Sequence, residues 1–189
     1  MESASNTPRA TESAEHPADE RVAVFDSAGR QVGSAERSRV YAEGLWHASA
    51  GVLVRSGDGR RVYVHRRSDD KAVFAGQHDC LAGGVVAPGE TAHDAALREL
   101  QEELGVVGVE LTPLARISWD GIWQGRPVRC HLHAYETRYD GPIVHQTSEI
   151  AAGWWWTPHE LALHLRDPDW QFVPDTRALL EDYLLAQDH

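Results

Sequence analysis

The sequence GVVAPGETAHDAALRELQEELGV, from Gly84 to Val106, decides how the rest of the chain is interpreted. Thr91, followed three residues later by Asp94, resembles a capping box, so we expect a helix to begin at Thr91. Gly105 suits a helix C-cap in the left-handed region of backbone space. Between these caps, apolar residues recur at steps of four and predict a stripe that packs against the rest of the fold: Ala92, Ala96, Leu100 and Leu104.

A second face of the same helix is acidic. Glu99, Glu102 and Glu103 are related by i, i+3 and i, i+4 spacing, so their carboxylates share one side. Carboxylates this close repel one another unless cations gather there, and oxygen ligands at this density suit Mg²⁺ or Mn²⁺. Arg98 lies one turn before Glu102 and could also reach back to Glu90, which would hold the preceding loop against the helix.

A solvated acidic helix face is the ordinary interpretation of a run such as E-x-x-E-E. The residues around this run favour a metal site instead. Gly83, Gly84 and Gly89 bracket the loop before the helix, where backbone groups can approach a metal ion or a phosphate closely. Glu90 and Arg98 add a charged pair at matching positions.

The stretch resembles the signature box of the Nudix hydrolases, G-x5-E-x7-R-E-U-x-E-E-x-G-U, in which U is a bulky aliphatic residue. Every fixed position is filled between Gly84 and Val106. The resemblance implies an α/β fold, the Nudix-type α/β/α sandwich with a mixed β-sheet. It also implies a Mg²⁺-dependent hydrolase that cleaves a diphosphate bond in a nucleoside-diphosphate-type or related organic diphosphate.

The resemblance also implies roles for individual residues. It assigns the metal, Mg²⁺ or Mn²⁺, to one backbone carbonyl and three carboxylates: Gly84, Glu99, Glu102 and Glu103. The general base is either an acid of the box helix, here Glu99, or an acid of a later loop, here Glu149. Arg98 completes the catalytic set as a support of the site.

Flanking motifs from about Arg21 to Leu185 resemble the branch related to type I isopentenyl-diphosphate isomerase. They read VAVFDSAGRQVG, LWHASAGVLV, VHRRSDDKAVFAGQHD, SEIAAGWWWTPHEL and DPDWQFVPD. Arg67 and Lys71 match basic positions that contact the substrate diphosphate in that branch. Arginine and lysine are suitable partners for phosphate oxygens. A solvated basic turn after a strand is the alternative for these two residues.

Isomerisation itself is disfavoured. Gly83 stands where the isomerases carry a catalytic cysteine, Val85 replaces a metal histidine, and Val40 falls where the first metal histidine is expected, seven residues before His47. The complete R-E-x-x-E-E set favours hydrolysis. A third alternative is a Nudix module that senses a nucleotide without cleaving it, and the intact box argues against that.

Length and charge limit the function further. A chain of 189 residues suits one domain, which we expect at residues 21–189 after a disordered tail at residues 1–20. The net charge of −11 argues against a general nucleic-acid binder. No apolar run approaches a membrane span, and the N-terminus lacks the apolar segment of a signal peptide. We therefore expect a cytoplasmic enzyme with a small-molecule diphosphate substrate.

The remaining sequence predicts strands around the box helix and helices after them. We expect an N-terminal hairpin at 21–33, which could contribute to a homodimer, and strands at 46–54, 62–65, 127–137 and 153–156. A turn is expected at Asp120-Gly121, and helices are expected to begin at Thr157 and Pro174. His131 and His133 fall on one face of their strand, where a polar sheet face or a substrate pocket is favoured over a metal site. Cys80 and Cys130 lack the spacing of a zinc site.

Overall fold

The computed structural model describes residues 20–187, with side chains up to residue 181. The predicted tail at residues 1–20 lies outside the described residues except for Glu20. Glu20 is tied to the fold, since its carboxylate lies 2.7 Å from Arg37 Nη1 and its backbone oxygen accepts the Arg37 amide. No helix in the described range is long and apolar enough to cross a membrane.

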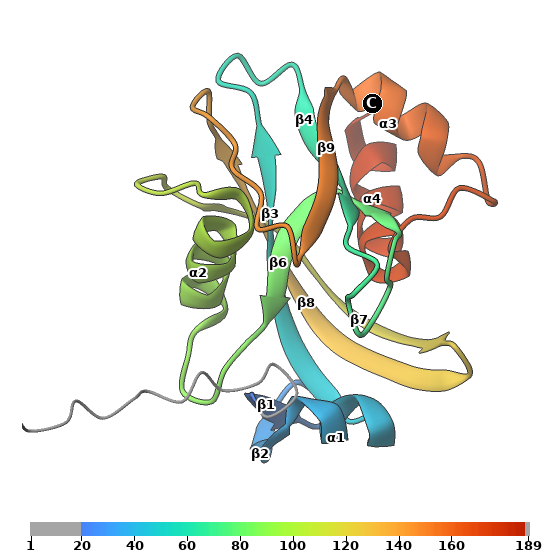
Figure 1. The fold of residues 1–189 in the computed structure, drawn as a ribbon. Coiled ribbons are helices and arrows are strands. Elements are labelled where there is room, and N and C mark those ends of the chain that lie inside the picture. The colour runs from blue at the N-terminus through green and yellow to red at the C-terminus, as the bar shows by residue number, and fades with distance from the viewer. Residues whose placement is uncertain (1–19, 188–189) are drawn as a thin grey trace, which may run out of the picture.

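In the described part of the chain, nine strands form one mixed sheet accompanied by four helices (Figure 1). The strands are β1 (Arg21–Phe25), β2 (Gln31–Glu36), β3 (Trp46–Arg55), β4 (Val62–Arg67), β5 (His78–Asp79), β6 (Leu81–Val85), β7 (Thr112–Trp123), β8 (Arg126–Arg138) and β9 (Ile150–Trp156). The helices are α1 (Arg37–Glu43), α2 (Ala92–Leu104), α3 (Pro158–Leu165) and α4 (Pro174–Gln187).

Strand β3 is the centre of the sheet. It pairs antiparallel with β1, β4 and β6 and parallel with β8, in a register that runs from Trp46 opposite Arg129 to Arg55 opposite Arg138. Strand β9 pairs with β4, and β7 pairs with β8. The sheet is therefore mixed, and the prediction of a central strand at 46–54 is confirmed.

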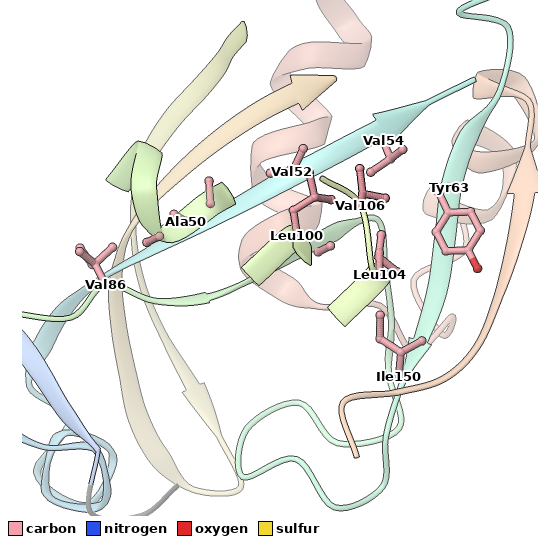
Figure 2. Packing of buried hydrophobic residues seen from close by; sticks show 13 residues of the cluster. Ala50, Val52, Val54, Tyr63, Val86, Leu100, Leu104, Val106 and Ile150 are labelled. Atoms are coloured by element: carbon pink, nitrogen blue, oxygen red, sulfur yellow. The ribbon is translucent and has the colours of Figure 1, made fainter. Parts of the chain in front are cut away.

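Helices cover both faces of the sheet, with α2 on one side and α3 and α4 on the other (Figure 1). Because side chains alternate along a strand, every second residue of β3 faces α2. These residues pack against Leu100 and Leu104 of α2 (Figure 2): Ala48, Ala50, Val52 and Val54. Leu53 faces the opposite side and packs in a second cluster with Leu179 and Leu180 of α4. The α/β/α sandwich is confirmed.

Helix α2 has the ends that its sequence predicts. Thr91 Oγ1 accepts a hydrogen bond from the Asp94 amide at 3.1 Å, and Gly105 closes the helix with φ at 67°. Leu100 is fully buried, and burial of a leucine side chain contributes roughly 1.5–3 kcal/mol to stability. The helix is thereby fixed on the sheet, with its acidic face beside β6.

The predicted turn at Asp120-Gly121 is wrong. Strand β7 continues to Trp123, and the chain reverses at Gln124-Gly125, where both residues have positive φ, 48° and 76°. A two-residue hairpin loop of type I′ has positive φ at both positions, and its twist then matches that of the flanking strands. Asp120-Gly121 instead lies within the ladder, with Asp120 opposite Arg129.

Candidate active site

Glu103 is the most enclosed acid of α2, with only 2% of its surface exposed. Its carboxylate accepts a hydrogen bond from the Gly83 amide at 3.0 Å and lies 3.5 Å from Lys71 Nζ. Burial raises the pKa of Glu103 to about 7, while the Lys71 and Arg67 cations act in the opposite direction. The carboxylate thus relies on neighbouring positive charge to stay ionised.

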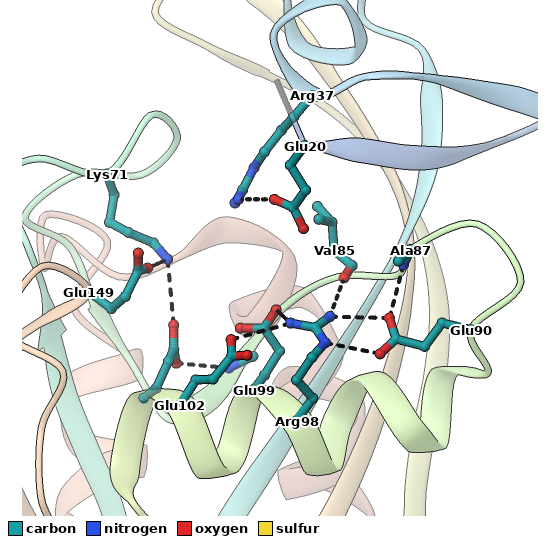
Figure 3. Close-up of polar contacts among 12 residues, drawn as sticks. Glu20, Arg37, Lys71, Val85, Ala87, Glu90, Arg98, Glu99, Glu102 and Glu149 are labelled. Atoms are coloured by element: carbon teal, nitrogen blue, oxygen red, sulfur yellow. Dashed lines mark hydrogen bonds and ion pairs between the residues drawn. The ribbon is translucent and has the colours of Figure 1, made fainter. Parts of the chain in front are cut away.

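Arg98 organises the exposed half of the same face (Figure 3). Its guanidinium donates to Glu90 through two bonds, Nε to Oε1 at 2.9 Å and Nη2 to Oε2 at 3.1 Å. It also donates to the Val85 carbonyl at 3.2 Å, to Glu99 at 2.7 Å and to Glu102 at 3.3 Å. The prediction that Arg98 reaches back to Glu90 and holds the loop against the helix is confirmed.

Glu99 lies between Arg98 and strand β6. Burial raises the pKa of Glu99, and the Arg98 guanidinium opposes that shift. The approach to β6 is close, because a Cβ added at Gly84 would lie 2.4 Å from Glu99 Oε1. Glycine at position 84 therefore lets this carboxylate reach the backbone of the strand. Glu102 is the most exposed of the three acids, at 51%.

Glu149 joins this site from the far end of the sequence. Lys71 Nζ forms an ion pair with Glu149 and with Glu103, which lie 78 and 32 positions away from it in the chain (Figure 3). The Ser68 amide also donates to the Glu149 carbonyl at 2.8 Å. The loop after β4 and the loop before β9 are thereby held together over α2.

Arg67 lies at the end of β4 with its side chain 13% exposed. It donates to the Val73 carbonyl at 3.2 Å, and its Nη1 lies 3.9 Å from Asp79 Oδ2. Its buried Nε has no hydrogen-bond partner among the described residues. A buried guanidinium N–H without a partner is costly, so this side chain is suited to accept a further anion.

Beside these residues lies a cavity of about 90 Å³. Lys71, Gly83 and Gly84 line the cavity and also border the carboxylates of α2. Apolar side chains form much of the rest, among them Phe74 and Val173. The acidic face and the cavity therefore belong to one continuous site.

Sequence reasoning did not assign Arg37, Asp79 or Asp175 to this site, although all three line the cavity. A signal was present for Asp175, which ends the DPDWQFVPD motif. The same kind of signal was present for Asp79, which ends the VHRRSDDKAVFAGQHD motif. Its carboxylate accepts hydrogen bonds from the amides of Cys80 at 2.7 Å and Leu81 at 3.1 Å. Burial raises the pKa of Asp79 to about 6, against the opposing effect of Arg67.

His131 is held by structural contacts; it is buried, and it is not among the residues that line the cavity, so it lies neither on an exposed polar sheet face nor in the pocket. Its Nδ1 lies 2.7 Å from Ser118 Oγ and its Nε2 lies 2.9 Å from the Asp26 carbonyl, while the ring stacks on Trp46. As the side chains lie, no three imidazole, thiol or carboxylate groups within residues 20–181 converge on one point that could hold a metal ion. Glu99 and Glu102 turn towards Arg98 instead.

Position 83 is closed to any larger residue. A Cβ there would lie 2.1 Å from the Ala50 carbonyl oxygen and 2.5 Å from Gly51 Cα, both backbone atoms of β3. The cysteine that the isomerases carry at this position would require β3 and β6 to move apart. The pairing of β6 with β3 therefore requires glycine at position 83.

A family model described as NUDIX domain matches residues 45–176 of the chain. The chain is 66% identical over 173 residues to the uncharacterized Nudix hydrolase orf19 of Rhodococcus erythropolis, with 89% of this chain and 94% of that protein covered. It is 40% identical over 159 residues to the uncharacterized Nudix hydrolase SCO1686 of Streptomyces coelicolor, with 84% of each covered. These names do not bear on the isomerase-like branch, which stays a prediction.

Solved structures resemble the fold. The crystal structure of DR0079 from Deinococcus radiodurans superposes with a TM-score of 0.70 at 23% identity, covering 86% of this chain and 98% of that one. The MutT protein from Methanosarcina mazei Go1 superposes with a TM-score of 0.60 at 19% identity, covering 76% and 96%. At these identities the likeness shows the fold alone.

Proposed function

The chain belongs to the Nudix hydrolase family, and we propose that it cleaves a diphosphate bond in a nucleoside-diphosphate-type or related organic diphosphate, with Mg²⁺ or Mn²⁺ as cofactor. One observation carries the proposal. The filled box folds into a helix whose buried acid, Glu103, meets the cation of a distant loop, Lys71, and Lys71 also pairs with Glu149. This is a site where carboxylates and phosphate-binding cations lie together beside a cavity.

The chemistry of the donor set fits a hard divalent cation. The candidate ligands are all oxygen atoms, from the carboxylates of Glu99, Glu102 and Glu103 and from the Gly84 carbonyl. Glu103 already lies against a positive charge, the Lys71 ammonium. When bound, the cation neutralises phosphate oxygens and makes water a better nucleophile. Glu99 and Glu102 now contact the Arg98 guanidinium, and with a cation present they would bind the cation instead.

The protein's own groups supply the rest of the reaction. The oxygen of a water molecule bonds to one phosphorus, the bridging P–O bond breaks, and the bridging oxygen leaves with the other phosphate. Arg67 and Lys71 bind phosphate oxygens, and a carboxylate takes the proton that the water loses. Arg98 and Glu90 keep the loop and the helix in register.

Glu149 is the acid that we assign to proton uptake, and Glu99 is the alternative. Glu149 is 30% exposed and its partner is a lysine, whose flexible ammonium can move to a phosphate and release the carboxylate. Glu99 is 13% exposed and is bound by the Arg98 guanidinium at 2.7 Å. It also belongs to the candidate ligand set, a role that occupies the same oxygen atoms.

The experiment that tests this function is release of phosphate or nucleotide in the presence of Mg²⁺. The panel holds dinucleotides, nucleotide sugars, coenzyme A and isoprenoid diphosphates. Wild type is compared with the double variant Glu102→Gln/Glu103→Gln and with Glu43→Gln, an exposed glutamate on α1.

We expect turnover that the double variant loses and Glu43→Gln keeps. Tight binding of a nucleotide without turnover would favour the sensing module. Interconversion of isoprenoid diphosphates without phosphate release would favour the isomerase. A small-molecule substrate, a cytoplasmic location and a homodimer complete the proposal.

A further inference from the structure

We propose that the cavity binds the organic group of the substrate and that Phe74 limits this group to one smaller than a nucleobase. The inference rests on the proposed function, because it concerns what is attached to the diphosphate. It makes Phe74 a residue that determines specificity. The argument has three parts: where the cavity lies, how large it is and how Phe74 is held.

The cavity is where the organic group of a bound diphosphate would go. Lys71 and Gly83 line it, and both contact Glu103. Gly84 lines it as well and faces Glu99. Lys71, Gly83 and Gly84 therefore border both the carboxylates and the cavity. A diphosphate held at the acids therefore has its substituent within reach of this space.

The size of the cavity excludes a large ring. An apolar cavity of about 150 Å³ takes one benzene molecule, and this cavity measures about 90 Å³. A purine base has nine ring atoms, more than benzene, so it is larger than this space. Charged side chains line part of the cavity, and the rest of the lining includes Val73, Val128, Leu132 and Val173, so a short aliphatic group suits this apolar part.

Phe74 forms one wall and is held there against its backbone preference. Its φ is 57°, a conformation that strains a residue with a bulky side chain. Backbone strain of this kind occurs at functional sites, where the surrounding structure fixes it. Its ring is 5% exposed and packs edge-on against Trp119 and Trp123, at 6.0 and 5.2 Å between centroids. Neither tryptophan lines the cavity, so they support the ring from behind.

The test uses diphosphate monoesters of graded size: ethyl, isobutyl, benzyl and adenosyl. Phosphate release is measured for wild type, Phe74→Gly and Phe74→Leu, with Phe25→Leu as a control for a ring lost outside the cavity. Glycine suits the positive φ, so Phe74→Gly removes the wall and the backbone strain together. Leucine keeps most of the wall.

We expect wild type to favour the isobutyl ester over the benzyl ester by at least tenfold in kcat/KM. One extra or missing methylene group in an apolar pocket changes kcat/KM by about 10–200-fold. Phe74→Gly should reduce that ratio by tenfold or more, mainly through KM for the benzyl ester, whereas Phe74→Leu and Phe25→Leu should keep it. An unchanged ratio in Phe74→Gly, or a wild type that prefers the adenosyl ester, would overturn the inference.

A binding measurement separates this inference from the proposed function. Methylene diphosphonate analogues of the same esters are titrated calorimetrically into each folded variant, with thermal unfolding as the check on folding. If wild type hydrolyses none of the esters but binds the analogues with the same size limit, the hydrolase proposal fails and the cavity assignment stands. If wild type hydrolyses the esters but binds all analogues alike, the cavity assignment fails alone.

Discussion

Arg98 and Glu90 form a two-bond pair, with Nε to Oε1 at 2.9 Å and Nη2 to Oε2 at 3.1 Å, across the loop that leads into α2. Arg98→Lys keeps the charge but cannot form both bonds. We expect it to lower the free energy of unfolding by about 1–3 kcal/mol and to reduce activity. Urea unfolding measures this. The control is Arg39→Lys, at an exposed ion pair with Glu43, which should lower the free energy of unfolding by less than about 0.5 kcal/mol.

Removal of the Lys71 cation should destabilise the protein, because the buried Glu103 carboxylate then lacks a positive partner. Loss of one partner from a buried ion pair destabilises by about 3–5 kcal/mol, although protonation of Glu103 would reduce that figure. We expect Lys71→Met to be strongly destabilised in urea with a metal chelator present. The double variant Lys71→Met/Glu103→Gln should recover part of the loss. Additive effects of the two substitutions would show that the pair contributes little.

Asp79 should make stability depend on pH. Burial raises its pKa in the folded state to about 6, from 3.8 in the unfolded chain. The folded state therefore holds a proton that the unfolded state has lost, and the stabilisation present below pH 3.8 is lost as pH rises through about 6. Each pKa unit corresponds to about 1.4 kcal/mol. As the pH rises from 4 to 6, the free energy of unfolding of Asp79→Asn should therefore increase relative to that of wild type by up to a few kcal/mol. A difference independent of pH would contradict this.

The two candidate bases should be separable by kinetics. A general base contributes about 10²–10⁴-fold to the rate. We expect Glu149→Gln to lower kcat by that factor and to leave metal affinity unchanged, because Glu149 is not among the candidate ligands. Glu99→Gln should weaken metal binding, measured by calorimetry. If kcat at saturating metal falls further in Glu99→Gln than in Glu149→Gln, the general base is Glu99 and not Glu149.

The box helix could be predicted from sequence because its determinants are local. Thr91 and Asp94 cap it, Gly105 ends it, and the four-residue steps fix which face is buried. The site as a whole is not local. Asp79 and Asp175 reach the cavity only because β5 and the start of α4 meet across the sheet, and the sequence carries no periodic signal for such a contact.

The β7–β8 turn was missed because its first residue is an unusual one. Asp-Gly is a stronger hairpin signal than Gln-Gly, yet the chain turns at Gln124-Gly125. Asparagine tolerates positive φ better than glutamine. We therefore expect Gln124→Asn to stabilise the protein by up to about 1 kcal/mol, measured as a rise in the urea midpoint. Gln146→Asn, at a residue without positive φ, should not do so.

Lys71 is the chain's only lysine, and 9% of its side chain is exposed between two carboxylates. Lys71 is therefore the only side-chain amine of this sequence that an amine-directed reagent can acylate, and it lies at the centre of the candidate site. Acylation at Lys71 would uncouple the loop after β4 from the loop before β9, and a phosphate bound there would slow the reaction. The protein thus carries a natural, single-position chemical label whose reactivity reports occupancy of its own site, without any cysteine or lysine having to be engineered.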